Sequence, residues 1–259
     1  MTNLDLHGQS LTSLSPDLLH DDVSALYIYD NALTVLPDDI TTLSHLTVLD
    51  AAMNQIQQLP EDWQNLRKLR YLYLHENQLT DLPAGIGSLN NLIYLNVNRN
   101  QLTQLPESIG NLSNILEMRA IGNPLAILSE SVGQLTTLRE LHLRDCALKT
   151  LPHSIGGMQA LRKLDIQDNP LSILPDSLCN LQNLTELNLR NNQLSVLPDC
   201  IGNLSKLITL DLRNNPLTTL PESLLELPNL QKLDLRWTHQ LQVPGWLADL
   251  EVRGCTVFI

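Results

Sequence analysis

The side chains best suited to hold another molecule are five tyrosines, all in the first half of a 259-residue chain. In "RYLYLHENQLTDLP", residues 70–83, Tyr71 and Tyr73 alternate with Leu72 and Leu74. Alternation of this kind is typical of a strand with one buried face and one exposed face. We therefore expect both rings on the face opposite the leucines. There an apolar ring with a hydroxyl suits the centre of a protein interface.

Residues with the spacing of a catalytic or metal site are missing from the sequence. No GxGxxG, Walker A, HExxH or GxSxG pattern is present, and the seven histidines scatter along the chain. The four cysteines, Cys146, Cys179, Cys200 and Cys255, form neither a CxxC nor a Cys/His pair. We expect them to be reduced thiols, without a zinc site or a disulfide framework. The sequence predicts no enzyme, cofactor or metal site.

An asparagine that recurs at a constant interval sets the organisation of the chain. It stands at Asn31, Asn54, Asn77, Asn100, Asn123, Asn169, Asn192 and Asn215, with Cys146 and Thr238 in the same slot and Gln9 one position out of step. The eleven repeats follow the pattern L-x-L-x-x-N-x-L-x-x-L-P-x-x-I-x-x-L-x-x-L, and the repeat at 187–207 matches it throughout. A period of this length indicates a repeat solenoid.

The pattern resembles the leucine-rich repeat superfamily in its 23-residue intracellular form, over about residues 4–250. The resemblance implies an α/β horseshoe solenoid with a parallel concave β-sheet and short helical or 3-10 convex segments. Similar repeats occur in intracellular Ras-pathway scaffolds, in plant intracellular proteins and in bacterial proteins that include translocated effectors. We expect one domain over residues 1–259, with a weakly capped first repeat at 1–22 and the last repeat and cap at 233–259.

Each part of the repeat has a physical role. L-x-L predicts a short strand, and the asparagine after it can satisfy buried backbone groups of two neighbouring coils. The family pattern also allows cysteine in this slot, so Cys146 is expected to be structural. The recurring proline suits the first position of a short helix, and the acids after it suit a helix N-terminus. Ser129 replaces one of these prolines without an evident reason.

The columns that flank the strand leucines face the predicted concave surface. The two tyrosine pairs come from repeats on either side of a repeat whose side chains in these columns are smaller. This arrangement predicts a shallow pocket about one strand wide. The alternative is that tyrosine simply favours strands. The residues expected to bind a partner here are Tyr27, Tyr29, Asp50, Met53, Tyr71, Tyr73, His75 and Tyr94.

A second candidate surface is a group of arginines further along the chain: Arg119, Arg144, Arg190, Arg213 and Arg236. Two interpretations stay open. The arginines can pair with neighbouring aspartates across strands, or they can grip acidic side chains of a partner.

Charge and hydropathy restrict the partners. A net charge of −12 disfavours nucleic acid. No apolar run approaches the length of a membrane span and no signal peptide is visible, so we expect no transmembrane segment and a cytoplasmic location, or a host cytosol for an effector. The preferred function is a non-catalytic module that binds a protein or peptide on its concave face. The alternatives are a translocated bacterial effector and a structural protein that self-assembles through its N-terminal edge; otherwise we expect a monomer.

Overall fold

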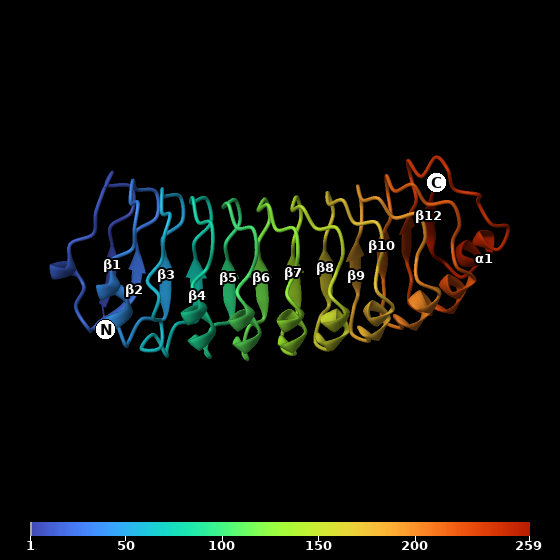
Figure 1. Ribbon diagram of the computed structural model, residues 1–259. Helices are drawn as coiled ribbons and strands as arrows, with labels where there is room; N and C mark the ends of the chain where they lie inside the picture. The colour runs from blue at the N-terminus through green and yellow to red at the C-terminus, as the bar shows by residue number, and fades with distance from the viewer. Residues whose placement is uncertain (1) are drawn as a thin grey trace. The chain divides into compact units, whose positions relative to one another are not determined.

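The computed structural model describes residues 2–259, which form two compact units that divide between Leu125 and Ala126. Each unit is a stack of coils in chain order, and the short 3-10 turns of each unit lie in a row along one side (Figure 1). Each coil contributes one short parallel strand, as the L-x-L pattern predicts.

The described part of the first unit, residues 2–125, carries six strands, and each strand pairs in parallel with the next along the chain. They are β1 (Thr2–Asp5), β2 (Val23–Tyr27), β3 (Val48–Asp50), β4 (Tyr71–Tyr73), β5 (Tyr94–Asn96) and β6 (Glu117–Arg119). The central leucine of β2 to β5 is fully buried, so the residues on either side of it point to the exposed face.

The second unit carries the other six strands, with parallel pairing along the run. They are β7 (Glu140–His142), β8 (Lys163–Asp165), β9 (Glu186–Asn188), β10 (Thr209–Asp211), β11 (Lys232–Asp234) and β12 (Thr256–Phe258). Before β12 stands α1 (Leu247–Val252), which buries Leu247 and Leu250. The repeat pattern did not predict β12, because its sequence lacks the two leucines.

Within residues 2–259, nine 3-10 turns form the opposite side of the coils: η1 (Pro16–Leu18), η2 (Asp38–Thr42), η3 (Ala84–Ser88), η4 (Glu107–Asn111), η5 (Glu130–Gln134), η6 (His153–Gly157), η7 (Asp176–Asn180), η8 (Asp199–Asn203) and η9 (Glu222–Glu226). The recurring proline is the N-cap of these turns rather than their first residue, except at Pro16. Ser129 takes the same N-cap position, and its hydroxyl accepts a hydrogen bond from Ser131 N at 3.0 Å. This bond gives a reason for the missing proline.

The third repeat departs from the others. Its outer segment holds no 3-10 turn, so Glu61 does not stand at a helix N-terminus as the sequence suggested. Trp63 replaces the usual isoleucine and is fully buried, with its indole nitrogen donating to Pro60 O at 2.5 Å. The indole N–H thus binds the proline carbonyl that the backbone N–H of the isoleucine binds in other repeats, as Ile40 N binds Pro37 O.

The predicted asparagine ladder is confirmed. Asn100 is 7% exposed, and its amide nitrogen donates to Val97 O in its own coil at 3.0 Å and to Leu74 O in the preceding coil at 2.9 Å. Its amide oxygen accepts from Leu79 N at 3.0 Å. One side chain thus satisfies backbone groups of two coils, which is why the slot is so constant.

The two ends of the chain differ. Leu4, Leu6 and Leu11 of the first coil are only half-buried, whereas their counterparts in later coils are fully buried. At the other end, β12 pairs with β11 in a register that sets Phe258 beside Asp234. Phe258 is 37% exposed and so extends the sheet surface.

The expectation of four reduced cysteines is wrong for one pair. Cys179 and Cys200 form a disulfide with their Cα atoms 5.8 Å apart. They occupy the 3-10 turns η7 and η8 of adjacent coils. Sequence spacing hid the pair, because the stacking of coils brings residues 21 apart into contact. Cys255 is a buried free cysteine, and Cys146 is half-buried with its Sγ atom 3.7 Å from Arg144 O.

No helix within residues 2–259 is long and apolar enough to cross a bilayer.

Candidate functional site

The predicted tyrosine site is built on the exposed face of β2, β3, β4 and β5. The register places Tyr27 beside Asp50, and Asp50 beside Tyr73, in one row across three strands. In the parallel row before it, Tyr71 stands beside Tyr94. The structure therefore brings together tyrosines that come from separate repeats of the sequence, and all of them are half-buried.

The rings in this cluster contact one another. The Tyr73 and Tyr94 ring centroids lie 5.1 Å apart at a tilt of 41°, and the Tyr73 ring meets His75 edge-on at 6.5 Å. These separations fall in the range of favourable aromatic pairs. Burial raises the pKa of Tyr73, and the neighbouring Tyr94 and Asp50 charges raise it further. The Tyr73 hydroxyl therefore stays protonated and able to donate.

Asp50 is the central polar group. Burial raises the pKa of its carboxyl group, although a backbone hydrogen bond from Ala52 N at 3.2 Å and the charge of His75 act in the opposite direction. The described part of the chain offers Asp50 no ion-pair partner. A half-buried carboxylate between two tyrosines thus keeps most of its hydrogen-bonding capacity for something else.

The next row along the strands continues the surface. Ala52, only 2% exposed, forms its floor. On one side the Tyr29 ring stacks on His7 with centroids 4.8 Å apart. On the other side His75 has its Nδ1 atom buried without a hydrogen bond in the structure. Met53 follows with a φ of 54° and an exposed side chain, at the edge of the cluster. The pocket that the sequence suggested stays a prediction.

The arginines lie in different surroundings. Arg213 donates from Nε to Asp211 Oδ1 at 2.9 Å, and Arg236 donates to both oxygens of Asp234 at 2.8 and 2.7 Å. Asp234 is fully buried beneath them. In the first unit Arg119 pairs with Glu117 at 2.5 Å, whereas Arg144 of the second unit is exposed. At Arg213 and Arg236 the structure matches the interpretation as cross-strand and local ion pairs.

Sequence reasoning missed Trp237. Its ring is half-exposed, its φ of 66° is rare for a bulky residue, and three arginines surround it. The guanidinium carbons of Arg190, Arg213 and Arg236 lie 5.6, 5.9 and 5.7 Å from the ring centroid, within the range of cation–π contacts. The signal in the sequence was an aromatic residue directly before the ladder position, where the other repeats hold mainly Asp, Asn, Glu or Gly.

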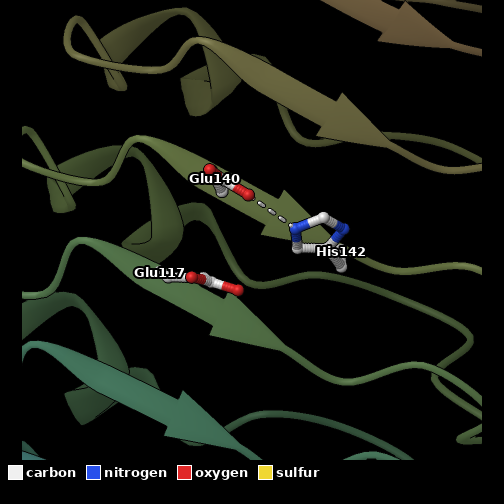
Figure 2. Close-up of side chains that lie close together, drawn as sticks. All are labelled: Glu117, Glu140 and His142. Carbon is white, nitrogen blue, oxygen red and sulfur yellow. Dashed lines mark hydrogen bonds and ion pairs between the residues drawn. The ribbon is translucent and has the colours of Figure 1, made fainter.

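A carboxylate–imidazole pair stands on β7. His142 is buried, and its Nε2 lies 3.1 Å from Glu140 Oε2 (Figure 2). Such a pair fixes the orientation of the imidazole, but it specifies no reaction without a nucleophile or a substrate group beside it.

A coiled repeat with leucine-lined strands and an asparagine ladder defines a solenoid of the leucine-rich repeat type. The family model described as "Leucine rich repeat" matches residues 21–79, 136–194 and 182–239, and the model "Leucine Rich repeats (2 copies)" matches residues 67–114. The chain belongs to the leucine-rich repeat family. No curated protein matched the chain in a sequence comparison.

Solved structures of other leucine-rich repeat proteins are similar. A Leptospira interrogans protein shares 28% identity over 96% of this chain and 76% of its own, with a TM-score of 0.64. The effector protein YopM of Yersinia pestis shares 29% over 91% and 60%, with a TM-score of 0.70.

A plant receptor is also similar. The ectodomain of the receptor kinase GASSHO1/SCHENGEN3 of Arabidopsis thaliana, in complex with CASPARIAN STRIP INTEGRITY FACTOR 2, shares 33% identity, with a TM-score of 0.75. The match covers 86% of this chain but only 28% of the receptor chain. This chain therefore spans less than a third of that structure.

Proposed function

We propose that this chain is a non-catalytic module that binds a folded protein or an extended peptide on the exposed face of its first-unit strands. Leucine-rich repeat proteins generally mediate protein–protein interaction. The observation that carries the proposal is the cluster on β2 to β5 in which Tyr27 and Tyr73 stand on either side of Asp50 and the Tyr94 ring contacts that of Tyr73. Exposed aromatic clusters usually mark interfaces, and tyrosine has few rotatable bonds to freeze on binding.

The remaining predicted contacts have supporting roles in this proposal. Tyr29, Tyr71, His75 and Met53 border the tyrosine cluster. In the second unit, Arg190, Arg213 and Arg236 form a separate basic and aromatic surface with Trp237, and Arg144 is a further exposed arginine of that unit. We give this second surface a secondary role, because Arg213 and Arg236 already bind Asp211 and Asp234. Arg119 is secondary for the same reason, since it binds Glu117.

The proposal also concerns location and other partners. The net charge of −12 disfavours nucleic acid as the ligand. We also propose a cytoplasmic location. The Cys179–Cys200 disulfide argues against it, because disulfides persist mainly in oxidising compartments.

Two further functions follow from specific observations. Similarity to the Yersinia effector favours action inside a host cell, which a translocation assay in the source organism tests. The open edge of β1, with half-buried Leu4 behind it, favours self-association. Light scattering at increasing concentration separates a self-assembling protein from a monomer.

The main proposal is tested by affinity capture followed by measurement with the purified partner. Wild type and Tyr73→Ala serve as baits, with Val35→Ala as a control that removes an exposed apolar side chain elsewhere in the first unit. We expect a partner that wild type and the Val35 variant bind with equal Kd, and that the Tyr73 variant binds at least tenfold more weakly. A partner that binds all three equally would contradict the proposal.

A further inference from the structure

The segment 1–66 is one-sided in charge. It contains ten Asp or Glu side chains and no Lys or Arg, whereas the rest of the chain contains 18 acidic and 16 basic side chains. The strands β1, β2 and β3 therefore come from a segment with no permanent cation of its own. Nearly the whole net charge of the protein belongs to this end of the sequence.

Asp50 differs from two of the three carboxylates that occupy the same column of the second unit, Asp211 and Asp234, whereas the third, Asp165, is followed by Gln167. The side chain two positions after Asp211 is Arg213, and the one after Asp234 is Arg236; each arginine binds its aspartate through its guanidinium group. The corresponding residue after Asp50 is Ala52, and its neighbours in that row are Tyr29 and His75. The repeat thus places a carboxylate here without the arginine that binds Asp211 and Asp234, and Asp50 differs from Asp165 because it stands between two tyrosines.

Aromatic rings take the place of that cation. Tyr27 and Tyr73 stand directly on either side of Asp50, on strands that lie about 10 Å apart across β3. The negative face of an aromatic ring attracts an ammonium or guanidinium group, and a partly desolvated carboxylate between two rings adds a full charge. Burial raises the pKa of Asp50, as expected for a carboxylate that has lost part of its hydration.

We propose that Tyr27, Asp50 and Tyr73 form a subsite for a cationic side chain, an arginine or lysine of the protein ligand. This inference rests on the proposed function, because it names the chemistry of one ligand side chain at the same surface. The carboxylate binds the charge, and the two rings pack against the aliphatic stem and the faces of the cationic group. A guanidinium fits best, since it can stack on a ring and donate two parallel hydrogen bonds to one carboxylate.

The test is a titration of the full chain with N-acetyl-arginine methylamide, with the neutral isostere N-acetyl-citrulline methylamide as the control probe. The five tyrosines carry ¹³C-labelled rings, and Tyr→Phe variants assign their signals. We expect the Tyr27 and Tyr73 signals to shift saturably with the arginine probe, and the citrulline probe to bind at least fivefold more weakly. Equal binding of the two probes, or no binding of the arginine probe, would overturn the proposal.

Two variants locate the charge. Asp50→Asn should weaken binding of the arginine probe at least fivefold. Asp165→Asn is the matched control, because Asp165 occupies the same column, lacks a following arginine and stands between His142 and Asn188 instead of tyrosines. It should leave the affinity unchanged. Wild-type affinity in the Asp50 variant would refute the role of its carboxylate, and circular dichroism melts confirm that both variants fold.

The same variants separate this inference from the proposed function once a partner is in hand. If a partner no longer binds Tyr73→Ala but still binds Asp50→Asn, the proposed binding surface is supported and the cation subsite is refuted. If both variants bind the partner as wild type does, the proposed binding surface and the cation subsite are both refuted. Loss in both variants, with the citrulline form of the critical ligand arginine also failing to bind, would support both.

Discussion

Individual asparagines hold the coils of this protein together, because each one satisfies backbone groups that neither coil can satisfy alone. The amide of Asn100 reaches Leu74 O in one coil and Val97 O in the next. Sequence alone predicted this role, since asparagine recurs at most rungs and its small side chain both donates and accepts hydrogen bonds.

Asn100→Ala should lower the free energy of unfolding by about 1–3 kcal/mol, because it leaves buried backbone donors and acceptors without hydrogen-bond partners. Gln101→Ala removes an exposed neighbour and should change it by less than about 0.5 kcal/mol. Urea denaturation of both variants checks the difference. Equal midpoints would mean that the ladder contributes little to stability.

The residue before each ladder position was harder to interpret from sequence. Asn191 has a φ of 54°, and its side chain bonds to Asp168 and Asn214 of the adjacent coils. An alanine there would meet the steric cost of the left-handed region, about 1–2 kcal/mol. The slot favours Asp, Asn and Gly, but the hydrogen bonds between slots become visible only when the coils are stacked.

Asp234 supports the end of the second unit through charge. Burial opposes its ionisation, but the hydrogen bond from Arg236 and the charges of Arg213 and Arg236 outweigh it and lower the pKa of Asp234. A lowered pKa stabilises the fold above the unfolded value of about 3.9, and this stabilisation is lost as pH falls through the folded value. Asp234→Asn should therefore cost about 2 kcal/mol at pH 7 and progressively less below pH 4.

Chemical denaturation from pH 7 to pH 3 measures this difference between wild type and the Asp234 variant. Asp249→Asn removes an exposed carboxylate from the same end of the chain and serves as the control. A gap between wild type and the Asp234 variant that stays constant with pH would contradict the assigned ion pairs.

The repeat element was the part most open to prediction, because its 23-residue period fixes which residues are buried. Three departures needed the structure. The third repeat holds Trp63 and no 3-10 turn, β12 forms without the leucine pattern, and Cys179 meets Cys200 across two turns. Each departure depends on a contact between coils or on an irregular segment. The pattern of a single repeat predicts neither of these features.

The first strand should be the least protected. β1 pairs with β2 on one side only, and Leu4 and Leu6 behind it are half-buried. Amide hydrogen exchange should be faster in residues 4–14 than in β5, because local opening there exposes little apolar surface. Uniform protection at a dilution where the protein is monomeric would show that the first coil has a cover we have not identified.

The disulfide should stabilise the turns η7 and η8. It closes a loop between residues 21 apart, for which loop entropy predicts about 3 kcal/mol. Denaturation with and without a reducing agent should show this loss for wild type. The variant Cys200→Ser should denature at one midpoint in both conditions. Insensitivity of wild type to the reductant would argue that the two thiols are not joined.

On the scale of the whole molecule, charge and aromatic side chains are unevenly distributed along the sequence. The acidic segment 1–66 carries two of the five tyrosines and Asp50, and the remaining tyrosines follow on β4 and β5. The tyrosine positions could be predicted from the repeat register. The contacts among Tyr73, Tyr94 and His75 could not, because they depend on rotamers and not on spacing.

The measurement that tests the central claim most directly is calorimetric binding of the captured, purified partner to the variant Tyr27→Ala/Tyr73→Ala. Both rings lie outside the leucine core, so the variant should melt at nearly the wild-type temperature. It should bind at least 30-fold more weakly, a loss of about 2 kcal/mol or more, as expected when interface hot spots are truncated. Wild-type affinity in the folded variant would contradict the account.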